Sequence, residues 1–430
     1  MLKKIFFIFS ISTISLLNAQ RDTLYNVGAP ITKTVCIDSV CKELRCDHGL
    51  DIHTFEIYNG DGIGVSSKTG RTQGYYLGTV GIQLTLFTEE NHLWKNGKFS
   101  LFMLNNHGGT PSASNVGDLQ VFDNMEAPSV KKFNYYEGKT IDFRNFFYTF
   151  FYEHTFKNFR LLAGQYDINY DMANSNTGFN FINSSFGASP AITVNVPSFS
   201  TYPFTSLTLR GEYNKGKFYY RSSVSEGTGG DQFVNLHGNS YNFQDHEGVM
   251  LMNEAEIRNV VGDVWKSSIK LGLWNHTGRI FFDRTDTTGS TKIKGNNGLY
   301  LIADKVLFFE KQDSAQGLSG YFVADWAPGK QNFFNYNIGG GLSYCGLIKK
   351  RPEDRISLGA FFPMVNQELV KKQGYANTEI EAELNYNIKM NAFINLQPCI
   401  QYIYQPGAQR NVYNPIAFLV RLTIRNGLFN

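Results

Sequence analysis

Apolar and polar residues alternate along the segment TEIEAELNYNIKM, residues 378–390. Successive side chains of a β-strand point to opposite faces, so a strand here would have one polar face and one apolar face. The polar face would carry Glu379, Glu381 and Glu383, followed by Asn385, Asn387 and Lys389, and the apolar face would carry Ile380, Ala382, Leu384, Tyr386 and Ile388. As a helix, the same residues form no clean apolar stripe. The pattern therefore predicts a strand.

The same alternation recurs along most of the chain. It is clear in segments of about ten residues or fewer, the length that a tilted strand needs to cross a bilayer. These segments are 79–86, 207–213, 251–258, 269–274, 395–404 and 417–425. Two further segments, 99–104 and 146–152, are apolar on both faces, which is compatible with strands that pack against an inner loop.

Alternation alone fits both a soluble β-sandwich and a membrane barrel. The start of the chain, MLKKIFFIFSISTISLLNAQ, has the charged, apolar and small-residue regions of a secretory signal peptide ending at Ala19. Alternation continues into the last residues, with no interdomain linker and no apolar run long enough for a spanning helix. Only helices and closed barrels satisfy backbone groups in lipid. The chain is therefore predicted to be all-β, with a single transmembrane antiparallel β-barrel.

Three regions are expected on this basis: a signal peptide at 1–19, a short periplasmic segment at 20–48 and a barrel at 49–430. The middle region contains Cys36, Cys41 and Cys46. In an oxidising periplasm one disulfide within this cluster is expected, with the pairing left open. Only His48 lies close by, and the spacing does not suit zinc, so no metal or cofactor is expected.

Composition narrows the choice of partners. The formal charge is +3, and removal of Lys3 and Lys4 with the signal peptide leaves +1. Nucleic-acid binding would need a clustered basic surface, which this charge does not suggest. The 36 Phe and 24 Tyr residues suit the aromatic girdles of a membrane barrel.

A succession of short motifs carries a family resemblance from about residue 49 to the end. In order, these are VGDLQVFDNMEAP (116–128), LLAGQYDIN (161–169), FINSSFG (181–187), YP (202–203), EGVMLMNEAEIR (247–258), IGGGLSYCG (338–346), RPEDRISLG (351–359) and the segment from 378 to 424. The succession resembles the carbohydrate-selective porin family of Gram-negative outer membranes. The resemblance implies a sixteen-stranded barrel with a narrowed polar passage. Its partners would be small carbohydrates, outer-membrane lipids and the barrel-assembly machinery, and the choice between monomer and trimer stays open.

Two connections, about 107–140 and 169–205, are too long to be turns. Their length fits either solvent-exposed surface loops or loops that fold inward and narrow the lumen, and the family motifs favour the inward path. Within the family motifs they contain, Asp118, Glu126 and Asn183 are predicted to narrow the passage. A charge on the lipid face costs about 2–4 kcal/mol at the bilayer midplane, so the polar rows must face the lumen. The predicted pore-lining residues on strands are Arg210, Glu254, Glu379, Glu381, Glu383, Arg421 and Arg425, all expected to be in contact with water.

Alternative functions remain open at this point. Paired carboxylates occur in glycoside hydrolases, but acidic residues in a barrel lumen more often line a pore, and His107, His154 and His276 have no identifiable serine partner in the sequence. A non-enzyme is therefore expected. A general or anion-preferring porin is the alternative of the same class, and it would differ from a carbohydrate porin only in selectivity. An anion-preferring pore should have a ladder of basic residues. A non-conducting adhesion barrel is the alternative of a different class.

Overall fold

A computed structural model of the chain describes residues 50–126, 145–196, 199–229, 245–261, 264–286, 288–310 and 313–426, together with 238, 239, 241 and 243. It also describes the backbone of four short strands, β1 (Cys36–Ile37), β2 (Val40–Cys41), β6 (Lys131–Asn134) and β7 (Lys139–Asp142). The register of β1 and β2 places Cys36 opposite Cys41. The predicted signal peptide and the predicted disulfide lie outside the described residues.

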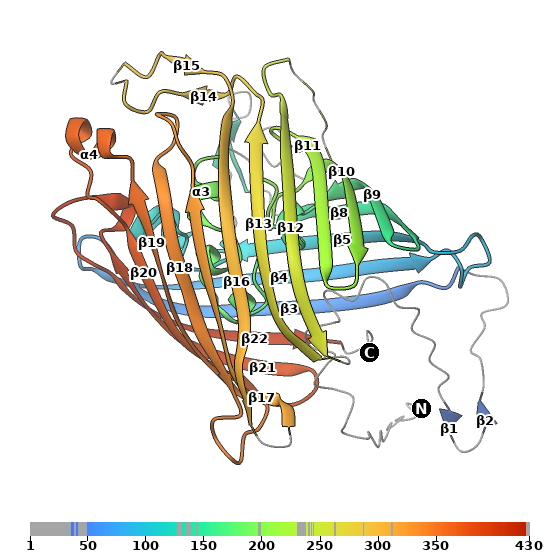
Figure 1. The fold of residues 1–430 in the computed structure, drawn as a ribbon. Helices are drawn as coiled ribbons and strands as arrows, with labels where there is room; N and C mark the ends of the chain where they lie inside the picture. The colour runs from blue at the N-terminus through green and yellow to red at the C-terminus, as the bar shows by residue number, and fades with distance from the viewer. Residues whose placement is uncertain are drawn as a thin grey trace.

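Among the described residues, sixteen strands form one closed antiparallel barrel (Figure 1). In chain order they are β3 (His53–Ser66), β4 (Thr72–Phe87), β5 (Gly97–Gly108), β8 (Asn145–Phe156), β9 (Phe159–Tyr166), β10 (Ser206–Lys215), β11 (Phe218–Glu226), β12 (Val249–Val261), β13 (Val264–His276), β16 (Asn296–Glu310), β17 (Asp313–Trp326), β18 (Phe334–Cys345), β19 (Arg355–Val365), β20 (Ile380–Lys389), β21 (Ile394–Tyr404) and β22 (Ile416–Arg425). The last strand closes the barrel on the first, with Arg421 opposite Asp61. The predicted fold and strand number are confirmed.

The helices are short and lie in the connections between strands. They are η1 (Ser112–Val116), η2 (Ile168–Tyr170), η3 (Gly178–Asn180), α2 (Ser184–Gly187), α3 (Pro190–Thr193), α4 (Gln367–Gln373) and η4 (Pro406–Ala408). Among the described residues, none of these helices is long and apolar enough to cross a membrane.

The two faces of each strand meet different surroundings, as the alternation predicts. On β20, Glu381, Glu383 and Asn385 are buried inside the barrel. Leu384, which lies between Glu383 and Asn385 in the sequence, is 41% exposed on the outside. On β13, Leu271 and Leu273 are likewise exposed on the outer surface. Apolar residues on the outer surface of a closed barrel face lipid in a membrane.

The connections differ in length between the two ends of the barrel. At one end most strands are joined by short turns, such as 157–158 and 216–217. At the other end, 109–144 and 167–205 correspond to the two predicted long connections. Two more long connections, 227–248 and 277–295, were not predicted. The second contains the hairpin of β14 (Phe281–Phe282) and β15 (Lys292–Ile293).

The hydrophobic core lies inside the barrel, where the connection 167–205 folds inward (Figure 1). Its apolar residues Met172, Phe181, Phe186, Ile192 and Phe199 pack against Met252, Trp274, Tyr300, Tyr321 and Phe361 on the wall. On the wall formed by β5 and β8, Tyr202 and Phe204 pack against Leu104 and Tyr148. The expected packing of an inner loop against these two strands is confirmed.

The facing of β20 predicts the effect of a charge on its outer side. Leu384→Arg should destabilise the barrel by about 2–4 kcal/mol if it lies near the midplane, because arginine would replace leucine in lipid. The measurement is the fraction of protein that migrates as a heat-modifiable barrel in outer-membrane extracts. Leu384→Phe, which keeps an apolar side chain, is the matched control. Equal assembly of the two variants would show that this face does not meet lipid.

Candidate functional site

Carboxylates on the barrel wall hold the inward-folded chain by its backbone. We call residues 109–126 and 167–205 the inner segments. Glu379, which precedes β20, accepts hydrogen bonds from the backbone N–H groups of Leu119 and Gln120, each at 3.0 Å. Glu383 accepts from the backbone N–H groups of Ile182 at 2.9 Å and Asn183 at 2.8 Å. Each glutamate therefore fixes a different inner segment to the same part of the wall.

The same arrangement occurs on β12 and β16. Glu254 accepts from the backbone N–H of Ala173 and from the Tyr300 hydroxyl, both at 2.8 Å. Asp304 accepts from the backbone N–H of Thr177 at 2.9 Å and from the Ser175 hydroxyl at 2.7 Å. Asp304 was not predicted as a site residue. The only sequence signal for it is an isolated acid at an inward position of an apolar strand.

These contacts overturn one expectation. Glu254, Glu379 and Glu381 are 0% exposed, so they do not stand in open water as predicted. The same holds for Glu383 and Arg210, which are 1% exposed. The physical reason is that irregular backbone inside a barrel has N–H groups with no strand partner. A carboxylate is a strong acceptor for such groups. The acidic row therefore faces inward, as predicted, but the inner segments cover it.

The inner segments also carry three of the predicted residues. Asn183 caps α2, its side chain accepting from the Ser185 backbone N–H at 2.9 Å, and its amide nitrogen donates to Glu381. Glu126 accepts from the backbone N–H of Ser112 at 2.7 Å, and burial raises the pKa of Glu126 to about 7. Asp118 accepts from the backbone N–H of Phe122 at 2.9 Å, and burial raises the pKa of Asp118.

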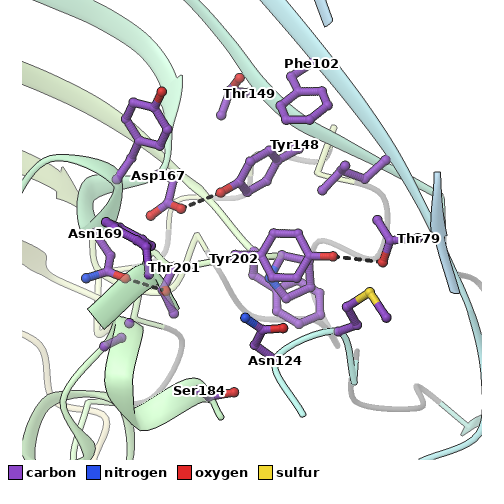
Figure 2. Close-up of a pocket in the computed structure, with 18 of the residues that line it drawn as sticks. Thr79, Phe102, Asn124, Tyr148, Thr149, Asp167, Asn169, Ser184, Thr201 and Tyr202 are labelled. Carbon is purple, nitrogen blue, oxygen red and sulfur yellow. Dashed lines mark hydrogen bonds between the residues drawn. The ribbon is translucent and has the colours of Figure 1, made fainter. Parts of the chain in front are cut away.

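A cavity of about 830 Å³ lies on the other side of the lumen. Its wall is formed by β3, β4, β5, β8, β9, β10 and β22, and the inner segments form its remaining side (Figure 2). The aromatic residues in its lining include Phe102, Tyr148, Phe151, Tyr166, Tyr170 and Tyr202. Figure 2 shows the Tyr148 hydroxyl directed at Asp167, and the Tyr202 hydroxyl at Thr79, 3.0 Å from its Oγ1. The cavity is therefore off-centre and follows one part of the barrel wall.

Charged side chains of both signs line this cavity. The acidic ones are Glu126, Glu153, Asp167 and Asp171, and the basic ones are Lys98, Arg160, Arg210 and Arg421. Burial raises the pKa of Asp167 to about 7. Of the predicted residues, Glu126, Asn183, Arg210 and Arg421 line the cavity, whereas Asp118, Glu254, Glu379, Glu381, Glu383 and Arg425 do not.

Several lining residues escaped prediction. Lys98, Glu153 and Arg160 lie on β5, β8 and β9, where the surrounding residues are apolar or aromatic and the alternation is weak. The sequence signal that could have identified each of these three residues is a single charged residue within an apolar or aromatic segment. Lys98 Nζ lies 3.6 Å from Glu153 Oε1, and Arg160 donates to Glu212 at 2.8 Å, so these charges form a connected network across neighbouring strands.

Arg421 connects three parts of the molecule. Its guanidinium Nη2 lies 2.7 Å from Asp61 Oδ2 on β3 and 2.9 Å from Asp123 Oδ1 in an inner segment. The ion pairs thus join the two strands at which the barrel closes and attach an inner segment to them. Arg425, four residues further along β22 on the same face, is partly buried and lies outside the cavity lining.

Other groups of polar residues were weighed as metal or catalytic sites. Among the described residues, Asp51, His53 and Glu90 bring possible ligand atoms within 4.8 Å of one another, but none of them lines the cavity. The His107 ring contacts the Tyr76 hydroxyl at 3.2 Å, the His154 ring contacts the Tyr152 hydroxyl at 2.7 Å, and the His276 ring contacts the Gly227 carbonyl at 2.8 Å. These contacts do not form a serine–histidine pair.

Comparison with known proteins supports the barrel architecture described above. The family described as carbohydrate-selective porin, OprB family, matches residues 71–425. Porin B of Pseudomonas aeruginosa is 24% identical over 252 residues, which cover 51% of this chain and 55% of that protein. The chain thus spans about half the length of this curated relative.

Solved structures support the fold. The high-pH structure of Pseudomonas putida OprB superposes with a TM-score of 0.74 at 17% identity, covering 87% of this chain and 94% of that one. The low-pH structure of the same protein gives a TM-score of 0.53 at 15% identity, covering 87% and 92%. At these identities the likeness concerns the fold. Because the family match extends over residues 71–425, most of this chain, the protein belongs to the OprB family of carbohydrate-selective porins and to the Gram-negative outer membrane.

Proposed function

We propose that this protein is a passive channel that lets mono- or small oligosaccharides diffuse selectively across the outer membrane. The route is the cavity between β3–β10 and the inner segments. Sugars present hydroxyl groups that both donate and accept hydrogen bonds, together with less polar ring faces. A channel for them needs polar groups of both kinds and aromatic surfaces, in contacts weak enough for the solute to leave.

The observation that carries the proposal is the composition of the cavity lining. Four carboxyl side chains and four basic side chains line it together with aromatic rings. The lining mixes charges of both signs and is not a ladder of basic residues alone, which favours neutral solutes over anions. The volume of about 830 Å³ favours a conducting lumen over a blocked adhesion barrel. The carboxylates considered for glycoside hydrolysis accept backbone hydrogen bonds, which suits anchoring better than acid–base chemistry.

Liposome swelling tests the proposed function directly. Purified protein should speed swelling in neutral monosaccharides, with lower rates for disaccharides and lower still for trisaccharides. Gluconate and glucosamine of nearly the same size are the matched charged solutes. Swelling no faster than in protein-free liposomes would point to the adhesion alternative, and faster uptake of gluconate than of glucose would point to an anion-preferring porin.

The anchoring carboxylates make a further prediction. Glu383→Gln should loosen the inner segment at Ile182 and Asn183, because a neutral amide is a weaker acceptor for two backbone N–H groups. Losing the charge-assisted part of these bonds should cost about 1–3 kcal/mol. Single-channel conductance should rise and the difference between mono- and disaccharide swelling rates should shrink. Glu368→Gln, on the exposed helix α4, is the control. Unchanged conductance in a folded Glu383→Gln barrel would mean that this anchor does not set the width of the passage.

Two carboxyl groups in the inner segments predict a pH dependence. Burial raises the pKa of Glu126 and of Asp167 to about 7. Both carboxyl groups therefore lose a proton and become negatively charged as the pH rises through neutrality. Since the pKa values lie above those of an unfolded chain, the stability that the neutral forms provide is present below about pH 4 and is lost as the pH approaches and passes 7.

The expected result is a stronger preference for cations at pH 8 than at pH 6, measured as the reversal potential across a salt gradient. The added negative charge in the cavity lining is the cause. The double variant Glu126→Gln/Asp167→Asn should flatten this change. A pH dependence of the same size in the double variant would assign it to other groups.

A further inference from the structure

The extracellular end of the barrel carries exposed basic residues on one side. Long connections face the outside in membrane barrels, whereas the turns on the periplasmic side are short. Four connections at the long-loop end join strands from β13 to β22: 277–295, 327–333, 366–379 and 405–415. We call five of their exposed residues the basic rim, namely Arg284, Lys330, Lys371, Lys372 and Arg410.

Contacts between the connections hold the basic rim in one place. The backbone N–H of Arg284 donates to the Lys330 carbonyl at 3.0 Å. The Arg284 guanidinium lies over the Phe333 ring, with Cζ 5.9 Å from the ring centroid. That ring meets the Tyr375 ring edge to face, with centroids 5.0 Å apart. Arg410 Nε donates to the Tyr375 carbonyl at 3.0 Å, so both arginines are attached to one aromatic pair.

Helix α4 brings the two lysines to the same place. Its Leu369 is buried in an apolar cluster at the barrel end, whereas Lys371 and Lys372 lie exposed in its last turn. Gln373 Nε2 donates to the Arg284 carbonyl at 2.6 Å, which attaches the helix to a neighbouring connection. Figure 1 shows α4 at the edge of the barrel end, near β19 and β20. The lysines therefore lie on a helix with a fixed position.

Carboxylates balance only part of this charge. The four connections contain eight basic residues and four acidic ones, and one of the acids, Glu379, is buried and binds an inner segment. Within the basic rim, the ion pairs among the described residues are Lys330 with Asp283 at 3.8 Å and Lys372 with Glu368 at 3.3 Å. Exposed pairs of this kind are weak. The basic rim therefore favours an anionic partner.

The basic rim does not belong to the cavity. None of its five residues is part of the cavity lining, whose wall is formed by β3 to β10 and β22. The basic rim belongs to connections between β13 and β22, where the inner segments pack against the wall. It is therefore displaced from the passage, and the proposed function gives it no task.

Aromatic side chains mark the level of the membrane surface close to the basic rim. Trp326, Tyr336 and Tyr402 lie at or near the extracellular ends of β17, β18 and β21 and are exposed on the outer surface. Trp and Tyr collect where hydrocarbon gives way to lipid head groups. Lys330 follows Trp326 by four residues, and Arg410 follows Tyr402 by eight. The basic rim therefore lies next to the layer of head groups.

We propose that the basic rim is a docking surface for the phosphate groups of glycolipids in the outer leaflet of the outer membrane. A phosphate monoester carries about 1.5–2 negative charges at pH 7 and offers three acceptor oxygens. Arginine binds such a group through two parallel N–H donors, and lysine binds it as a point charge. Each Lys or Arg close to an anionic membrane surface strengthens binding about fivefold. The assignment is independent of which solute the passage carries.

Titration of the purified protein with fluorescently labelled, phosphorylated lipid A in detergent micelles tests the docking surface. Lys371→Gln/Lys372→Gln removes two charges from the exposed last turn of α4 and should raise the Kd about thirtyfold. The matched control, Lys349→Gln/Lys350→Gln, removes two exposed charges from the turn between β18 and β19 at the opposite end. Its Kd should stay within about twofold of wild type, because these charges lie beyond a Debye length of about 8 Å from the basic rim.

Other ligands identify the kind of partner. Lipid A without its phosphate groups should bind the wild type at least about tenfold more weakly, and equal binding would overturn the assignment. Inorganic phosphate at millimolar concentration should leave labelled lipid A bound, whereas its displacement would show a site for free phosphate. Tighter binding of polygalacturonate than of lipid A would identify a soluble acidic polysaccharide as the partner and would also overturn the assignment.

A variant in a different connection provides an independent measurement. Arg410→Gln removes one charge and should raise the Kd for lipid A about fivefold. Heat-modifiable migration shows that each variant forms a barrel. If Arg410→Gln and Lys371→Gln/Lys372→Gln both bind lipid A as tightly as the control variant, the docking surface is rejected. The proposed function would then stand, because liposome swelling tests it separately.

Discussion

The structure depends on how the barrel satisfies irregular backbone that it holds inside. A strand in the wall has partners on both sides, but a chain folded into the lumen brings N–H groups that no neighbouring strand can bond. Here glutamates and an aspartate on the wall supply the acceptors, at Glu254, Asp304, Glu379 and Glu383. The inner segments thereby acquire fixed positions although they contain only short helices.

The location of these acceptors determines which side of the lumen the inner segments fill. Glu254 and Asp304 are on β12 and β16, and Glu379 and Glu383 are at β20, so the anchored backbone occupies that side of the lumen. The open volume is left along β3 to β10, where the lining mixes aromatic rings with charges of both signs. An off-centre passage lets one side of a solute contact a fixed barrel wall while the other side contacts the inner segments.

Much of the fold could be predicted because one physical contrast, lipid outside and protein or water inside, acts on every strand. It imposes period two on segments such as 380–389, and it sets which face of β20 carries Glu381 and which carries Leu384. The strand number followed from the family resemblance, since alternation does not count strands whose two faces are both apolar. Two of the four long connections, 109–144 and 167–205, were found from the sequence, and 227–248 and 277–295 were missed.

The site could be predicted only in part, for a related reason. Alternation shows that Glu379, Glu381 and Glu383 point inward, but it contains no information about what else occupies the lumen. The path of 167–205 is decided by contacts with residues far along the chain, such as those of Ile182 with Glu383. Lys98 and Glu153 were missed because the charges that matter in the passage lie on strands whose other residues are apolar.

The ion pairs of Arg421 have a consequence for biogenesis. This side chain on the last strand reaches Asp61 on the first strand and Asp123 in an inner segment. A chain whose last strand has not yet met its first cannot present the guanidinium to both carboxylates together. Full pairing of this guanidinium therefore requires both closure of the barrel and docking of the inner segment, so each of the two events stabilises the other through one side chain.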